Sequence, residues 1–348
     1  MMIIAIIKIF VLSALSFVVA MSVAPFFIRL LGYFRLGKQL RPAVEAPVFS
    51  ALHAAKAGTP TMGGVLVWGT AVGLSAVLAF LAAFVDGPVF QTLSFLSRKE
   101  TYLPLAALVA AALVGAADDL FNIRRIGPSG GGLRMRHRLI LYTLIAALGA
   151  AWFYFKLEWD ILRVPFFGDV SIGFWYVPLF LLVITATAFS VNEIDGLDGL
   201  AGGTLLAAFA AYGAIAFVQG KVDLAAFCGV IVGALLAFLW YNINPAQFFM
   251  GDTGAMSLGV TLGVVAMLTN SALLLPLIGV MFVLESLSVL VQLASRKLFG
   301  RKVFRSAPLH HHLEAIGWTE PQIVMRFWVI ASVAAVIGLV LALLDIVR

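Results

Sequence analysis

Ten long apolar segments recur along this sequence, and they constrain the fold more than any other feature. An apolar segment of about 18 residues is long enough to cross the hydrocarbon core of a bilayer as a helix. Unsatisfied backbone groups are costly in lipid, and the alternating pattern of a membrane β-barrel is absent. The sequence therefore predicts an all-α, polytopic membrane protein with ten transmembrane helices. The predicted spans are 3–30, 61–85, 101–117, 138–157, 173–191, 200–218, 223–241, 254–271, 273–294 and 323–346.

The composition supports a membrane location for nearly the whole chain. Of its 348 residues, 62% are hydrophobic and 11% are charged, a balance outside the range of soluble proteins. No linker, low-complexity segment or inverted repeat interrupts the pattern, so we expect a single domain over 1–348. The eighth and ninth spans are divided only by Thr269-Asn270-Ser271, and one kinked segment there would remove a crossing.

Positive charge gathers after odd-numbered spans. Sixteen of the 23 Lys and Arg residues follow the first, third and ninth spans. The positive-inside rule then predicts that this side is cytoplasmic and that both termini lie outside. The net charge of +6 reflects topology or an anionic substrate rather than nucleic acid, for which we find no binding module. The sixteen residues are Arg29, Arg35, Lys38, Arg41, Lys56, Arg124, Arg125, Arg134, Arg136, Arg138, Arg296, Lys297, Arg301, Lys302, Arg305 and Arg326.

Four polar motifs follow odd-numbered spans as well. Asp118-Asp119 ends the third span, residues 192–199 (NEIDGLDG) end the fifth, and residues 242–254 end the seventh. His310-His311-His312 follows the ninth span. The same parity argument therefore places all four motifs on the cytoplasmic face, where we expect the active site.

The acidic residues of these motifs favour a divalent cation. Asp118 and Asp119 are adjacent carboxylates that repel each other unless a cation relieves them, although an isolated pair would be read as solvated interface anchors. Carboxylate oxygens suit Mg²⁺, which binds through one or two carboxylates and substrate phosphates. Asp252, between Gly251 and Gly254, is the candidate metal ligand, and it could also cap the eighth helix.

The three consecutive histidines do not have the spacing of a zinc site, because neighbours in sequence cannot all face one ion. Arg301, Lys302 and Arg305 lie nearby, so the run is suited to donating hydrogen bonds to phosphate or sugar oxygens. A fortuitous histidine run in a basic loop is the alternative.

Two further segments supply candidate contacts. Residues 56–64 (KAGTPTMGG) lack the spacing of a Walker A loop, yet Lys56 and Thr61 could contact an anion; ordinary helix-start chemistry is the alternative. Glu285 lies inside the ninth span, where an ionisable group has a functional or a structural reason. Gln292, near the cytoplasmic end of that span, could reach the site.

Together these groups favour phosphoryl transfer involving a phosphorylated lipid, because a divalent cation held by the carboxylates and the basic donors neutralise phosphate charge. Two other classes remain open from the residues alone. An ion-coupled transporter would use intramembrane acids such as Glu285, with a pathway reaching both sides. A structural scaffold would leave the clustered motifs unexplained.

The motifs resemble those of the polyprenyl-phosphate N-acetylhexosamine-1-phosphate transferases, specifically the muramyl branch of that family. The resemblance spans nearly the whole chain. It is carried by residues 56–64 (KAGTPTMGG), Asp118-Asp119, 195–201 (DGLDGLA), FMGDTG ending at Gly254, and 308–314 (PLHHHLE) followed by Gly317-Trp318 and Arg326-Phe327-Trp328. The histidine run separates it from the sister transferases that use UDP-N-acetylglucosamine.

The resemblance implies ten helices, a homodimer in the bacterial inner membrane, and Mg²⁺-dependent transfer of phospho-MurNAc-pentapeptide from its UDP carrier to undecaprenyl phosphate, releasing UMP. It implies catalytic roles for Asp118, the expected base, and Asp119, with Asp252 binding Mg²⁺. The implied substrate contacts are Lys56, Thr61, Asn192, Asp195, Gly196, Leu197, Asp198, Asn242, Phe249, His310, His311 and His312.

The sequence departs from the family pattern at three places. Leu120, Phe121 and Asn122 replace the usual aromatic and nearby lysine after the aspartate pair, and Arg138 stands where the family has lysine. Glu193-Ile194 replaces the usual Leu-Thr. These changes concern the contacts to the lipid phosphate, because arginine and lysine bind phosphate differently.

Overall fold

The computed structural model describes residues 2–37, 56, 58–85, 87–98, 100–127 and 131–347. Two of the sixteen basic residues, Lys38 and Arg41, lie outside these residues, as does Ala57 of the 56–64 segment. The longer helices are α1 (Met2–Tyr33), α3 (Gly64–Phe84), α5 (Tyr102–Ile123), α6 (Met135–Ala151), α7 (Tyr176–Ile194), α8 (Leu200–Val218), α9 (Val222–Asn242), α10 (Gly251–Leu268), α12 (Val280–Phe299) and α14 (Glu320–Val347). The shorter elements are α4 (Pro88–Leu93), η2 (Trp152–Lys156), β1 (Ile161–Val164), β2 (Gly168–Ser171), η3 (Gly173–Trp175), η4 (Ala272–Leu274), α11 (Leu275–Ile278) and α13 (Leu309–Ala315).

The predicted helical membrane architecture is confirmed. Within the described ranges, nine helices are long and apolar enough to cross a membrane, or ten if one bent pair forms a single span. Each of these long helices overlaps one predicted span, because both membrane crossing and the prediction depend on apolar length. The protein is a multi-pass membrane protein.

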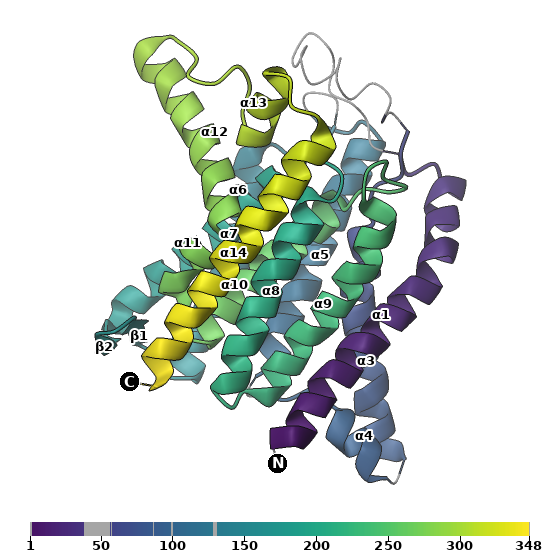
Figure 1. The fold of residues 1–348 in the computed structure, drawn as a ribbon, viewed down its shortest axis with the longest axis vertical. Coiled ribbons are helices and arrows are strands. Elements are labelled where there is room, and N and C mark those ends of the chain that lie inside the picture. The colour runs from purple at the N-terminus through teal and green to yellow at the C-terminus, as the bar shows by residue number, and fades with distance from the viewer. Residues whose placement is uncertain are drawn as a thin grey trace.

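The ninth span is the broken one. The segment Ala272–Ile278 meets α12 at an angle of 82°, with Gly279 between them. Thr269-Asn270-Ser271 does separate the eighth and ninth spans, as predicted, and a second break lies eight residues beyond Ser271. Beyond Gly279, α12 leans away from the bundle (Figure 1). Its inner end is held to α7 by a 2.7 Å hydrogen bond that the Ser286 hydroxyl donates to Ser190.

A small β-hairpin between α6 and α7 was not predicted. Strands β1 and β2 pair antiparallel, with Ile161 opposite Ser171 and Val164 opposite Gly168. Arg163 fastens this hairpin to the end of α14, since its Nε lies 2.6 Å from Asp345 Oδ2. That hydrogen bond raises the pKa of the Arg163 guanidinium. The hairpin and the C-terminal end lie side by side in Figure 1.

Helix α10 forms the centre of the bundle. It contacts α3, α5, α6, α7 and α8, and nearly all of its residues are buried. Close approach depends on glycine: a Cβ on Gly64 of α3 would lie 2.1 Å from the Cα of Gly254. Small residues allow this kind of backbone contact between membrane helices. The N-terminal end of α10 is thereby fixed against α3.

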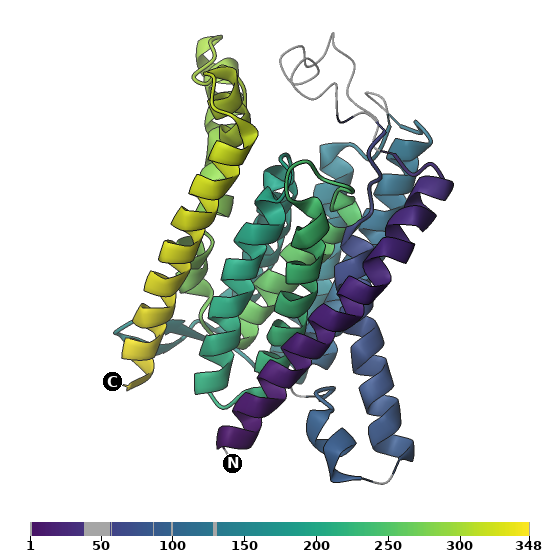
Figure 2. The same ribbon diagram turned by 45° about the vertical axis from the view of Figure 1, so that its right-hand side comes forward.

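Both chain ends lie at one end of the bundle, and the loop region above α10 lies at the other. Figure 2 shows the start of α1 and the end of α14 at the lower end, while α13 and the start of α14 lie at the opposite end. The four predicted polar motifs follow helices that end at this upper end. The side of the membrane that each end faces stays a prediction.

Candidate active site

A cluster of two carboxylates, one guanidinium and one amide lies where α5, α6, α7 and α10 meet. Arg138 joins the cluster, with Nε 2.6 Å from Asp118 Oδ2 and an Nη 3.1 Å from Asp252 Oδ2. The same guanidinium donates to Asn192 Oδ1 at 2.9 Å, and the Asn192 amide donates to Asp252 Oδ1 at 2.7 Å. Asp118 is fully buried, and its Oδ1 accepts from the Leu133 backbone at 2.6 Å. Asp118 and Asp252 therefore converge on one shared cation.

Asp119 has a different position from its neighbour. Its two oxygens accept backbone N–H groups of Asp252 at 3.1 Å and Thr253 at 3.0 Å, at the first turn of α10. A carboxylate is favourable there because the helix N-terminus has unpaired donors and a partial positive charge. Asp119 thus fixes the backbone that carries Asp252, while its predicted catalytic role stays a prediction.

The backbones of α5 and α10 lie so close together that no side chain fits between them at Gly115. A Cβ on Gly115 would lie 2.3 Å from the carbonyl oxygen of Asp252. Gly115 is one turn before Asp118 and Asp119, so glycine at this position lets the acidic end of α5 reach the start of α10. The two catalytic candidates on α5 and Asp252 on α10 are brought together by this backbone contact.

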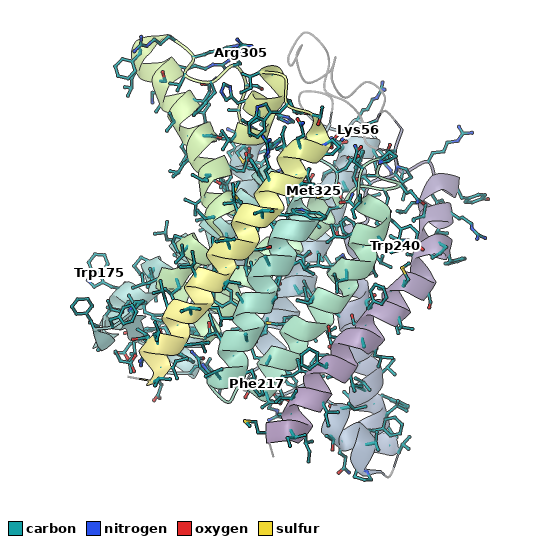
Figure 3. All side chains as sticks on the ribbon, viewed as in Figure 1. Lys56, Trp175, Phe217, Trp240, Arg305 and Met325 are labelled. Carbon is teal, nitrogen blue, oxygen red and sulfur yellow. The ribbon has the colours of Figure 1, made fainter. Side chains whose placement is uncertain are left out.

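A second cluster surrounds Lys56. Its Nζ lies 2.6 Å from Asp198 Oδ1 and 2.5 Å from Glu320 Oε1. Glu320 also accepts from the Asp198 backbone at 2.7 Å, and the Asn244 amide donates to both carboxylates. Two acids therefore share one lysine. Lys56 and Arg305 lie at the same end of the molecule, opposite Phe217 (Figure 3).

Several of the predicted nucleotide contacts lie around this second cluster, whereas Asn192 lies in the first one with Arg138 and Asp252. Asn242 accepts the Gly199 backbone N–H at 2.9 Å and donates to the Phe248 carbonyl at 2.8 Å. The Phe249 ring centre lies 5.9 Å from Lys56 Nζ, within the range of a cation–π contact. The Phe249 backbone N–H donates to the Pro60 carbonyl at 2.8 Å, and Thr61 is buried beside this pairing. Asp195, Gly196 and Leu197 lie in the loop between α7 and α8, which also carries Asp198, the partner of Lys56.

The three histidines point to different partners. His310 is fully buried, with Nδ1 3.0 Å from Glu285 Oε2. His311 Nδ1 lies 2.7 Å from Glu314 Oε2, and His312 Nδ1 accepts the Arg305 backbone N–H at 3.2 Å. The expectation that they do not share one ion agrees with this arrangement.

Gln292 supports a loop. Its Oε1 accepts the backbone N–H groups of Val303 and Phe304 at 3.0 Å, and its Nε2 donates to the Phe304 carbonyl at 3.0 Å. The side chain therefore holds the segment between α12 and α13, which carries basic residues and leads to the histidines of α13. The predicted substrate contact of Gln292 stays a prediction.

Two site residues were missed from the sequence. Glu320 begins α14, 264 positions after Lys56, and nothing local in the sequence indicates that they pair. Asn244 was missed because its neighbour Asn242 matched the motif. Arg138 was noted as a departure from the family pattern, and the lysine it replaces was a sign that a cation is needed at this point.

The carboxylates fit a magnesium ion. Among the described residues, no group of three or more His, Cys, Asp or Glu side chains is arranged to hold a metal ion. Mg²⁺ does not need such a group, because it keeps several waters and takes one or two carboxylates with substrate phosphates. Asp118 and Asp252 converge on a single cation, and the side chain of Asp252 is 18% exposed. Asp252, with Asp118 beside it, would hold the ion.

Comparison with known proteins identifies the family. A family model described as glycosyl transferase family 4 matches residues 101–270. The phospho-N-acetylmuramoyl-pentapeptide-transferase signature 1 matches residues 56–66, the segment that carries Lys56 and Thr61. The fold and the site thus define a membrane transferase of the glycosyl transferase 4 class.

Curated relatives give the particular family. The chain is 40% identical to the phospho-N-acetylmuramoyl-pentapeptide-transferase of Chloroflexus aggregans over 346 residues, covering 96% of this chain and 89% of the relative. It is 38% identical to the enzyme of the same name from Geobacillus kaustophilus, covering 94% and 95%. The corresponding protein of Rubrobacter xylanophilus is 39% identical, covering 94% of each. The chain belongs to the phospho-N-acetylmuramoyl-pentapeptide-transferase family, and the transporter and scaffold readings are not favoured.

Proposed function

We propose that this protein transfers phospho-MurNAc-pentapeptide from UDP-MurNAc-pentapeptide to undecaprenyl phosphate, giving lipid I and UMP. The observation that carries the proposal is the convergence of Asp118, Asp252, Asn192 and Arg138 at one end of an apolar bundle. A buried acid beside a cationic side chain, at the end of an apolar bundle, suits a reaction between a lipid phosphate and a nucleotide sugar. We place this end on the cytoplasmic face of the inner membrane, where the basic loops belong.

Different residues act on the two phosphate-bearing substrates. The lipid phosphate oxygen attacks the phosphorus that carries the sugar, and the bond from that phosphorus to the bridging oxygen breaks as UMP leaves. Asp118 accepts the proton of the lipid phosphate, whose second pKa lies near 6 in phosphate monoesters. Arg138 neutralises charge on Asp118 and Asp252 and orients both. The Lys56 cluster with Asp198, Asn242 and Phe249 holds the uridine nucleotide.

A bound Mg²⁺ would supply charge neutralisation for the two phosphates of the donor. Asp252 would hold it, and Asn192 and Asp119 would keep Asp252 in place through its side chain and its backbone. We also propose that the enzyme works as a homodimer, as the resemblance implies.

UMP release tests the proposal. Purified protein is incubated with undecaprenyl phosphate, Mg²⁺ and either UDP-MurNAc-pentapeptide or UDP-N-acetylglucosamine. We expect release from the muramyl donor alone, a requirement for Mg²⁺, and a loss on the order of 1,000-fold in Asp252→Ala. Release from UDP-N-acetylglucosamine would assign the protein the donor specificity of the sister transferases. No release from either donor would refute the proposal.

A further inference from the structure

A buried carboxylate and a buried imidazole connect α12 to α13, the helix that carries the three histidines. Glu285 of α12 and His310 of α13 are both fully buried. Glu285 Oε2 lies 3.0 Å from His310 Nδ1, and Oε1 accepts the His310 backbone N–H at 3.2 Å. One carboxylate therefore holds both the backbone and the ring of this histidine.

This arrangement decides where the ring proton lies. Oε1 accepts the His310 backbone N–H, and where Oε2 accepts as well, Nδ1 is the donor and carries a proton. Nε2 is then the ring atom left for another partner. It is buried and has no hydrogen-bond partner in the part of the chain that the structure describes. A buried polar atom without a partner costs free energy, and a ligand that supplies one removes the cost.

The free ring edge lies against the loop between α7 and α8. A Cβ on Gly196 would lie 2.2 Å from His310 Nε2, so only glycine lets the ring approach this backbone. The same loop carries Asp195 and also Asp198, the partner of Lys56. Nε2 therefore lies at the loop that also supplies an ion-pair partner to Lys56.

We propose that Glu285 is a positioning residue that keeps the proton on Nδ1 of His310 and so presents Nε2 to the bound nucleotide sugar. The inference rests on the proposed transferase function for the identity of that ligand. It assigns a reason to the one acid buried within the ninth span, and it explains why glycine stands at position 196.

A purely structural role for Glu285 is the alternative, and the chain offers a matched control for it. Ser286 follows Glu285 and ties α12 to α7 through Ser190 at 2.7 Å. Ser286→Ala removes a buried contact of the same helix without touching His310. Glu285→Gln keeps the shape of the side chain but places an NH₂ donor toward Nδ1 while its oxygen keeps the backbone N–H, so the proton is expected to move to Nε2.

Nitrogen NMR reads the tautomer without any reaction. Protein labelled with ¹⁵N-histidine is measured in bilayers as wild type, Glu285→Gln and Ser286→Ala, and His310→Gln identifies the His310 signals among the five histidines. We expect a protonated Nδ1 in wild type and Ser286→Ala and a protonated Nε2 in Glu285→Gln. A wild-type proton on Nε2 alone, or the same tautomer in Glu285→Gln and wild type, would overturn the inference.

Kinetics then tests whether the tautomer matters. Glu285→Gln should lower kcat on the order of 100-fold with the KM for the UDP donor within about 3-fold, while Glu285→Asp recovers part of the rate. On a His310→Ala background, Glu285→Gln should have no further effect on kcat. An equal loss on both backgrounds would show a structural role and reject the inference. Absence of wild-type turnover would instead count against the proposed function, since the NMR result stands apart from it.

Discussion

At the scale of single residues, the acidic centre depends on charge balance. Asp118 is fully buried, and the guanidinium of Arg138 contacts Asp118, Asp252 and Asn192 at once. Removing one partner of a buried ion pair leaves an uncompensated charge, which costs more than the pair contributes as a whole. Arg138 is therefore required to hold the two acids close together.

The first residue-scale prediction concerns Arg138. Arg138→Gln should lower turnover on the order of 1,000-fold and destabilise the protein by about 3 kcal/mol, because Asp118 and Asp252 lose their shared cation. Arg138→Lys should keep turnover within about tenfold of wild type, since a lysine retains the charge while losing the forked geometry. Turnover and thermal unfolding in detergent measure both effects. The exposed Arg136→Gln is the control, and a Gln variant at position 138 as active as this control would contradict the account.

The second residue-scale prediction concerns Glu320. Without this carboxylate, Lys56 keeps Asp198 as its one ion-pair partner among the described residues, and the Asp198 backbone N–H loses a charged acceptor. Glu320→Gln should raise the KM for the UDP donor about 10-fold with little change in kcat, because the site is less well preorganised. Gln322→Ala, a neighbour on the first turn of α14, should leave both constants unchanged. A selective fall in kcat would place Glu320 in the chemical step instead.

The same residues mark how far sequence reasoning reaches at this scale. Asp118, Asp252 and Lys56 were predicted because each belongs to a local motif near the end of an odd-numbered span. Their partners were not all visible: Lys56 pairs with Glu320 across 264 positions, and long-range pairing leaves no local pattern. Asp119 was predicted with Asp118, yet its oxygens hold the α10 backbone, which depends on the contact at Gly115 rather than on its own neighbours.

At the scale of elements, apolar length predicted the spans, and local breaks were the difficulty. The ninth span reads as one apolar run, and the 82° bend at Gly279 arises where α12 leaves the bundle. The β1–β2 hairpin was missed because two four-residue strands between long spans give no periodic signal. Tertiary contacts, in this case with α14, determine such short elements.

The hairpin gives an element-scale prediction. Arg163→Ala removes the 2.6 Å contact with Asp345. It should lower the free energy of unfolding by about 1 kcal/mol, because the lost contact is a partly exposed charged hydrogen bond. Turnover should stay at the wild-type level. Asp169→Ala is the matched control, because its 3.5 Å pair with Arg163 is exposed and should contribute almost nothing. Thermal unfolding in detergent measures both variants. Equal effects of the two substitutions would show that the hairpin is not fastened through Asp345.

At the scale of the whole molecule, the fold separates two tasks. The apolar spans place the chain in a bilayer, and α10 at the centre fixes Asp252 beside α5. The acidic cluster and the Lys56 cluster lie at the end of the bundle opposite both termini. A membrane-bound lipid and a water-soluble nucleotide sugar can both reach such an end, which is the central requirement of the proposed reaction.

The fate of the two donor phosphates tests this account most directly. UDP-MurNAc-pentapeptide labelled with ³²P either next to uridine or next to the sugar is incubated with undecaprenyl phosphate, Mg²⁺ and the purified protein. We predict that the label next to the sugar enters the lipid product and the label next to uridine leaves as UMP. If both labels leave together as UDP, the protein transfers the sugar alone, and the assignment of phosphosugar transfer to this site is wrong.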